Sequence, residues 1–211
     1  MKFDNIIPLG DNCAISIILK ELGLRKKSYP FDWISHVGSS PAHSILEQNI
    51  KLFLELLELG DIENITNKLV GITGITGDCI DEHNKINGDV IFPHERGSRE
   101  EIRNKYMRRL QRLYDDVVSD KHNNNLFIMI TRCCLVDDKL TNDLYDKIIN
   151  INANNKLIFV SGIEQPSMNI SHGINLNYKY IFYDESKGWE PDNSIFRPQL
   201  KEFLQNELYL C

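Results

Sequence analysis

The alternation of short apolar segments with longer segments of helical spacing is the feature that most constrains this fold. Runs rich in Ile, Leu, Val and Phe predict strands, and apolar residues three to four positions apart predict helices. Parallel strands need long crossovers between them, so this alternation indicates an α/β fold. We predict strands over 3–9, 88–92, 126–131, 156–160 and 178–183, and helices over 13–24, 40–59, 98–118, 141–150 and 199–208.

The expected architecture is a single α/β domain over residues 1–211, with a mostly parallel central sheet flanked by helices. No linker rich in Pro, Gly or Ser divides the chain, and 211 residues suffice to bury a sizeable core. The stretch around 60–88 lacks a clear periodicity and contains a Gly-Ile-Thr tandem repeat over 71–77. We therefore expect an irregular insertion around 60–88.

Bulk composition disfavours several classes of protein. The net charge of −6 argues against nucleic acid as a partner, and no apolar run approaches the roughly 20 residues of a membrane-spanning helix. The five cysteines are an odd number without a Cys-x-x-Cys pair, so we expect neither a disulfide framework nor a metal site, and no cofactor. The lack of a secretory signal predicts a cytoplasmic protein. Richness in Ile, Asn and Lys is typical of AT-rich genomes, and a viral source would imply the host cytoplasm.

Cys13 follows the first predicted strand and the turn Gly10-Asp11-Asn12, and the next predicted helix begins there. Ligands of parallel sheets collect at the carboxyl ends of the strands. A thiol in the first turn of a helix meets backbone N–H groups and the positive end of the helix dipole, which lower its pKa. The pattern therefore favours a nucleophilic Cys13, with Asp11 and Asn12 binding substrate. The alternative is that Cys13 is a small buried apolar residue.

A nucleophilic cysteine needs a base, and the chain contains six histidines. His94 comes shortly after the predicted strand over 88–92, so it can face the same sheet edge as Cys13. The alternative is a histidine that merely caps the strand. Of the remaining histidines, His36 and His43 are two further site candidates, and His83 and His122 are residues of polar loops. His172 also lies in a polar loop and fits either role.

Two charged residues complete the candidate site. Asp32, flanked by Phe31 and Trp33, is expected to be partly buried and to need partners. It could orient the histidine as the third member of a triad, although pinning a loop is the commoner role. Arg132 follows a buried strand and can bind a substrate anion or pair with a nearby aspartate. We assign Trp33 and Arg132 to substrate binding, and interpret Lys105, Arg108, Arg109 and Arg112 as a solvated helix face.

Four segments together resemble a family of papain-like cysteine peptidases found in bacteria and large DNA viruses. The resemblance spreads over the first 132 residues and implies a cysteine hydrolase acting on peptides, with Cys13 as nucleophile and His94 as base. The segments are Leu9-Gly10-x-x-Cys13, Pro30-Phe31-Asp32-Trp33-Ile34, Phe92-x-His94 and a strand over 127–132 that ends in Arg132.

Two other functional hypotheses stay open. The turn before Cys13 is also similar to the Gly-Asn-Cys turn of polysaccharide-biosynthesis acetyltransferase-like proteins and, more distantly, to the first block of Gly-Asp-Ser hydrolases. The late Asp-x-x-His block of those hydrolases is absent, because no Asp stands three residues before His172. The second hypothesis is therefore an acyltransferase or esterase acting on a glycan or a coenzyme A thioester. The third is a non-catalytic binding module in which Cys13 is buried.

Overall fold

Strands and helices alternate along most of the chain. The computed structural model describes residues 3–10, 14–32, 35–36, 42–72, 90–91, 97–131, 138–161, 178–182, 201–202 and 205. In chain order the elements are β1 (Asn5–Gly10), α1 (Ala14–Glu21), β2 (Ser35–His36), α2 (Ala42–Leu59), α3 (Ile62–Ile72), β3 (Val90–Ile91), α4 (Arg99–Tyr114), the π-helical turn η1 (Asp115–Ser119), β4 (Asn125–Thr131), α5 (Asp138–Ile151), β5 (Lys156–Ser161) and β6 (Tyr178–Phe182). Of the helix predicted over 199–208, residues 201, 202 and 205 are described, and they are helical.

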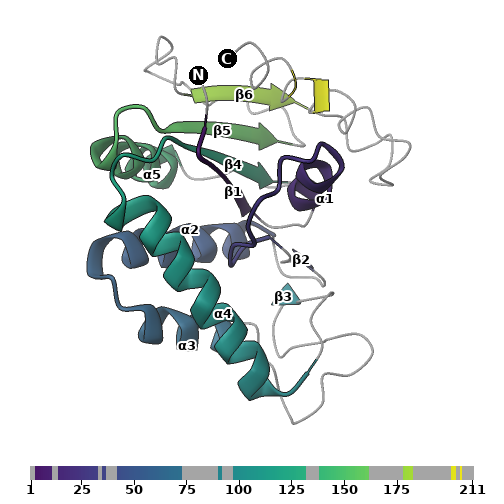
Figure 1. Ribbon diagram of the computed structural model, residues 1–211, viewed down its shortest axis with the longest axis vertical. Helices are drawn as coiled ribbons and strands as arrows, with labels where there is room; N and C mark the ends of the chain where they lie inside the picture. The colour runs from purple at the N-terminus through teal and green to yellow at the C-terminus, as the bar shows by residue number, and fades with distance from the viewer. Residues whose placement is uncertain are drawn as a thin grey trace.

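Four strands form one parallel sheet in the order β1-β4-β5-β6 (Figure 1). The short strands β2 and β3 form a separate antiparallel pair. On β4, all side chains from Asn125 to Met129 are buried, as expected for a strand covered on both faces. The predicted α/β fold with a parallel central sheet is confirmed.

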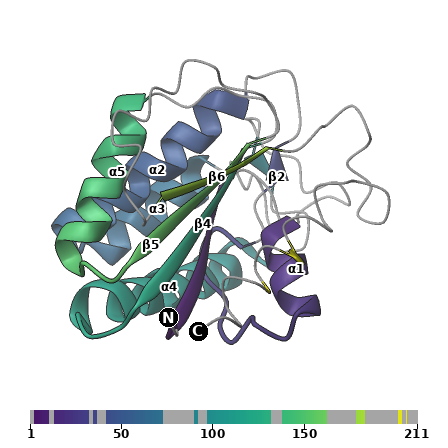
Figure 2. The ribbon, with the colours of Figure 1, turned by 90° about the horizontal axis from the view of Figure 1, so that it is seen from above.

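Helices cover both faces of the sheet. Figure 2 shows α2 and α5 on one side of the strands and α1 on the other. Helix α2 contacts both β1 and α5, and α5 also contacts β5. Helices α3 and α4 pack against each other, and α3 also packs on α2, so they extend the helical layer away from the sheet (Figure 1).

The irregular insertion predicted around 60–88 is wrong in its first part, because α3 occupies that stretch. Ile65 and Leu69 lie one helical turn apart and are both buried, which is the spacing of a helix with one apolar face. The polar residues between them obscured this periodicity in the sequence. The remainder of the predicted insertion, 73–88, lies outside the described residues.

Local side chains set the ends of these helices. Helix α2 stops at Gly60, whose φ of +66° lies in the left-handed region that favours glycine. Asp61 then caps α3 by accepting a hydrogen bond (3.0 Å) from the backbone N–H of Asn64. At α4, the Ser98 side chain accepts from the Glu101 backbone and the Glu101 side chain accepts from the Ser98 backbone. These two reciprocal hydrogen bonds form a capping box, which fixes the start of α4.

Three aromatic rings tie the loop before β2 to the core. Phe31 meets Phe53 of α2 edge-on with centroids 6.5 Å apart, and Phe53 lies 5.8 Å from Phe127 of β4. All three side chains are buried, and burying one such ring contributes about 1.5–3 kcal/mol. Because Phe31 is anchored in this way, the position of the next residue, Asp32, is fixed by the core.

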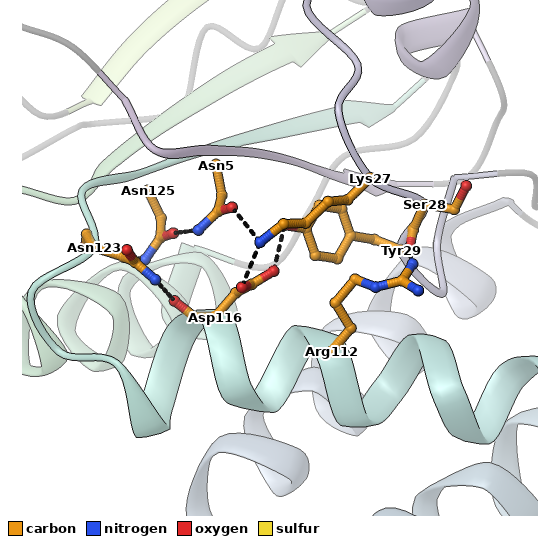
Figure 3. A network of polar contacts seen from close by, with 8 residues as sticks. All are labelled: Asn5, Lys27, Ser28, Tyr29, Arg112, Asp116, Asn123 and Asn125. Carbon is orange, nitrogen blue, oxygen red and sulfur yellow. Dashed lines mark hydrogen bonds and ion pairs between the residues drawn. The ribbon is translucent and has the colours of Figure 1, made fainter.

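Buried asparagines fix the register at the amino-terminal edge of the sheet. Asn5 of β1 donates from Nδ2 to Oδ1 of Asn125 on β4 (3.0 Å), as Figure 3 shows. Both the backbone N–H and Nδ2 of Asn125 donate to Oδ1 of Asn155, which directly precedes β5 (2.9 and 3.2 Å). Since a shift of any strand would leave these amides unsatisfied in the interior, the asparagines specify the strand alignment.

The Asn125→Ala variant is expected to lower the free energy of unfolding by about 2 kcal/mol, because Nδ2 of Asn5 loses its buried acceptor and Oδ1 of Asn155 loses one of its two donors. Urea denaturation measures this change. The matched control is Asn154→Ala, since Asn154 is exposed and its effect is expected to stay within about 0.5 kcal/mol. Equal stability of the two variants would contradict the role assigned to the buried asparagines.

Candidate active site

Cys13 lies in the sequence between the first strand and the first helix. Strand β1 ends at Gly10 and α1 begins at Ala14, so both elements predicted on either side of the turn are confirmed. Asp11, Asn12 and Cys13 themselves lie outside the described residues. The carboxyl end of β1 is the sheet edge at which ligands of parallel sheets collect.

The strand beside β1 ends at the same edge of the sheet. Gly10 at the end of β1 is the register partner of Ile130 on β4. Strand β4 ends at Thr131, so Arg132 is the next residue in the chain, although it lies outside the described residues. The two strands that precede Cys13 and Arg132 in sequence are thus direct neighbours.

The antiparallel pair β2–β3 joins two segments that are distant in sequence. Ser35 is the register partner of Ile91, and His36 that of Val90. Asp32 stands three residues before β2, and His94 stands three residues after β3. In an antiparallel pair, the start of one strand and the end of the other lie at the same end. Trp33 and His94 lie outside the described residues.

Asp32 is the one predicted site residue whose side chain the structure describes. It is 1% exposed, and its Oδ2 accepts hydrogen bonds from Nε (3.2 Å) and Nη2 (2.6 Å) of Arg25. Within the described part of the chain, its other oxygen, Oδ1, is buried and accepts no hydrogen bond. The burial of Asp32 and its need for a partner, both indicated by the sequence, are confirmed. Its Oδ1 can still accept a hydrogen bond.

Two opposing effects act on the acidity of Asp32. Burial raises the pKa of this carboxyl above its usual range, because removal from water disfavours the charged form. The hydrogen bonds and the positive charge of Arg25 act in the opposite direction and favour the carboxylate. A further N–H donor at Oδ1 would add to the effect of Arg25 and stabilise the charged form.

The loop that carries Asp32 is held against α4 and η1. The hydroxyl of Tyr29 donates to Oδ2 of Asp116 (2.8 Å), and Nζ of Lys27 contacts Oδ1 of the same carboxylate (2.6 Å). Arg112 donates from Nη1 to the carbonyl oxygen of Ser28 (2.6 Å). Figure 3 shows these side chains bridging the loop and the helix below it. Burial and the bond to Asp116 raise the pKa of Tyr29, so it stays a protonated donor.

Two residues near these predicted positions, Arg25 and Ser16, were not identified from the sequence. Arg25 belongs to the basic run Arg25-Lys26-Lys27, and a cation seven residues before a buried carboxylate is a usable signal for an ion pair. Ser16 lies in the first turn of α1, three residues after Cys13, and is 1% exposed. Among the described residues, its hydroxyl has no hydrogen-bond partner.

The described residues contain neither a candidate metal site nor a candidate membrane-spanning helix. No group of three or more His, Cys, Asp or Glu side chains able to hold a metal ion occurs among them. Over the same ranges, no helix combines the length and the apolar character that crossing a membrane requires.

The fold and the partial site define an α/β protein in which a cysteine follows the first strand and a buried carboxylate precedes the β2–β3 pair. Residues 4–158 match the family described as "Putative papain-like cysteine peptidase (DUF1796)", and the chain belongs to that family. The family resemblance inferred from the motifs is thereby confirmed. The chain is also 29% identical over 229 residues to the uncharacterized protein R408 of Acanthamoeba polyphaga mimivirus, a match that covers 95% of this chain and 97% of that protein. No solved structure matches the chain.

Proposed function

We propose that this protein is a cysteine hydrolase in which Cys13 is the nucleophile, His94 the general base and Asp32 the residue that orients His94. Membership in the papain-like cysteine peptidase family supports cysteine-dependent hydrolysis. The observation that carries the residue assignment is the buried Oδ1 of Asp32, which has no donor among the described residues. A buried acceptor without a partner costs about 1–3 kcal/mol, so a donor is expected there, and an imidazole N–H is suitable.

The β2–β3 pair supports the choice of His94 as that donor. Asp32 precedes Ser35 by three residues, His94 follows Ile91 by three, and Ser35 and Ile91 are register partners. The chain before β2 and the chain after β3 therefore leave the pair at the same end. In the proposed arrangement, one imidazole nitrogen of His94 donates to Oδ1 of Asp32, and the other accepts the proton of Cys13.

The chemistry follows from the position of Cys13 at the start of α1. Backbone N–H groups of the first helical turn favour the thiolate and can hold the oxyanion of a tetrahedral intermediate. The thiolate attacks a carbonyl carbon and forms a C–S bond, and the leaving amine or alcohol takes a proton from His94. Water, deprotonated by His94, then cleaves the thioester and restores the thiol.

The proposed substrate is a peptide, in keeping with the description of the family. We assign its binding to Asp11 and Asn12 in the turn after β1, to Trp33 beside Asp32, and to Arg132 directly after β4. Because β1 and β4 are neighbours, the turn residues and Arg132 follow adjacent strands. Arg132 would bind an anionic group of the substrate.

A second candidate is acyl transfer through the same covalent step, with a glycan hydroxyl or an amine in place of water. The observation that favours it is the parallel arrangement of β1, β4, β5 and β6. Such a sheet sets the nucleophile at a strand-to-helix turn, the position it occupies in the acyltransferase-like proteins that the turn resembles. Adding an alcohol or amine acceptor to an acylated enzyme distinguishes the two: transfer yields the acylated acceptor, hydrolysis the free acid.

Iodoacetamide labelling tests the proposal. At a pH near 6, Cys13 is expected to be alkylated at least about tenfold faster than the same cysteine in the urea-denatured protein, because an activated thiol stays largely ionised there. His94→Ala is expected to remove most of this difference. The rate is measured by mass spectrometry of the peptide that contains Cys13, and Cys79→Ser is the matched control that should leave it unchanged. Equal rates for the folded and denatured protein would refute the nucleophile assignment.

A further inference from the structure

A basic cleft lies between the loop after α1 and the last turns of α4. It has a volume of about 640 Å³. Its walls carry four cations, Lys26 and Lys27 from the loop and Arg108 and Arg112 from α4, together with the carboxylates of Asp115 and Asp116. From the sequence alone, Lys105, Arg108, Arg109 and Arg112 were expected to form a solvated helix face, whereas the fold places two of these cations in one cleft with a second basic segment.

The charges in this cleft do not cancel. Four cations face two carboxylates, which leaves an excess of two positive charges on a chain whose net charge is −6. Both oxygens of Asp116 are already engaged, by Lys27 and by the hydroxyl of Tyr29. Oδ1 of Asp115 accepts a hydrogen bond from Gln111 (2.9 Å).

Lys26 and Arg108 are the cations that remain available. Both are exposed, and within the described ranges neither makes a hydrogen bond or an ion pair with a carboxylate. They line the same cleft from two elements, one from the loop and one from α4. A negatively charged ligand at this position would therefore meet two cations that no carboxylate of the described residues engages.

The walls of the cleft are fixed in place. Arg112 donates to the carbonyl oxygen of Ser28, and Lys27 bridges Asp116 and Oδ1 of Asn5 (3.1 Å), as Figure 3 shows. These contacts join the loop to α4 and to the first residue of β1. A ligand would bind without having to order the loop, which lowers the entropic cost of association.

The spacing of the cations indicates which kind of negatively charged ligand fits the cleft. Arg108 and Arg112 lie one helical turn apart on α4, about 5–6 Å between their Cβ atoms. Alternate side chains of an extended peptide project to the same side about 6.6 Å apart. Cations spread over the cleft, with Lys26 on the loop and Arg108 and Arg112 along α4, match successive acidic side chains better than one compact anion. We propose that this cleft docks an acidic segment of a partner protein in extended conformation.

The docking proposal does not rest on the proposed hydrolase activity, although Lys27 and Arg112 of the cleft also hold the loop that carries Asp32. Lys27 contacts Asn5 at the start of β1, whereas Cys13 follows the opposite end of that strand. Binding at the cleft can therefore be tested without any measurement of activity, and a failure of either proposal leaves the other standing.

Fluorescence anisotropy with a labelled peptide tests the docking proposal. The probe is a short peptide in which Glu alternates with Ser, and the control peptide carries Gln in place of Glu. The Glu peptide is expected to bind at low salt and to dissociate as salt is raised, whereas the Gln peptide should not bind. In the full-length protein, Lys26→Glu combined with Arg108→Glu is expected to weaken binding by about tenfold or more. The milder pair Lys26→Ala with Arg108→Ala should weaken it less, in the same direction.

The matched control is Lys121→Glu combined with Lys147→Glu, which changes the net charge by the same amount away from the cleft and should leave the affinity nearly unchanged. Equal loss of binding in this control would reduce the effect to overall charge and overturn the proposal. Binding of the Gln peptide would also overturn the proposal. The same holds if single-stranded DNA binds more tightly than the Glu peptide, or if millimolar inorganic phosphate displaces the peptide but sodium chloride of equal ionic strength does not. These last two results would assign the cleft to nucleic acid or to a single compact anion.

Discussion

The Asp32→Asn variant is expected to slow the acylation of Cys13 by p-nitrophenyl acetate by about 100-fold or more, with little loss of stability. A carboxylate that receives the N–H of His94 holds the imidazole in the productive tautomer and stabilises the imidazolium that forms. An amide of the same shape does neither. The free energy of unfolding should change by less than about 1 kcal/mol, because Asn still offers an oxygen to Arg25 and no longer buries a charge.

A slower acylation rate together with an unchanged stability distinguishes a positioning role of Asp32 from a structural one. If Asp32 served only to hold Arg25 and its loop, the variant would lose stability and keep its rate. The pH–rate profile adds a second readout: on the proposed mechanism the carboxylate stabilises the imidazolium of His94, so its loss should move the acidic limb of the profile to lower pH. Asp146→Asn, at an exposed position on α5, is the matched control. A rate for Asp32→Asn within about twofold of the wild type would exclude the positioning role.

The Arg25→Gln variant is expected to lower the free energy of unfolding by about 3 kcal/mol near pH 8, because it leaves the buried carboxylate of Asp32 without its cation. The pKa of Asp32 is already raised by burial, and loss of Arg25 raises it further. A group whose pKa is higher in the folded than in the unfolded state favours folding at low pH, and this contribution is lost as the pH rises through the folded-state pKa. The deficit of the variant should therefore be smaller near pH 5 than near pH 8.

Urea denaturation at the two pH values measures this difference. Arg103→Gln is the matched control, because Arg103 pairs with the exposed Glu63 and its loss should cost no more than about 1 kcal/mol at either pH. Combining Arg25→Gln with Asp32→Asn should restore much of the stability, since no charge is then left unpaired. A deficit that is the same at both pH values would show that Arg25 acts through packing rather than through its charge.

The parallel sheet could be predicted because its strands are buried on both faces. Strand β4 is a continuous apolar run after Asn125, and such runs are recognisable without knowledge of their neighbours. Helix α3 was missed because its apolar residues form one narrow face among polar ones. Strand β2 has two residues and exists only through its pairing with β3, so no local pattern could indicate it.

The site was predictable to the extent that it depends on local sequence. The strand and helix beside Cys13, and the burial of Asp32 between aromatic residues, follow from neighbouring residues. The partner of Asp32 could not be predicted from neighbouring residues, because a basic residue such as Arg25 is equally typical of the end of a helix. The docking cleft could not be predicted from the sequence for a similar reason. Lys26 and Arg108 line the same cleft only because the loop packs on α4.

The pairing of β1 with β4 has a consequence for the order of events during synthesis. Asn5 and Asn125, which align the two strands, are 120 residues apart. At about 5–20 residues per second, a ribosome needs roughly 6–24 s to add that length of chain. Until β4 has left the ribosome, β1 has no strand to pair with. The segment that follows β1 is therefore not yet positioned by the sheet. On the proposed mechanism, the newly made thiol therefore stays unactivated until more than half of the chain has been translated.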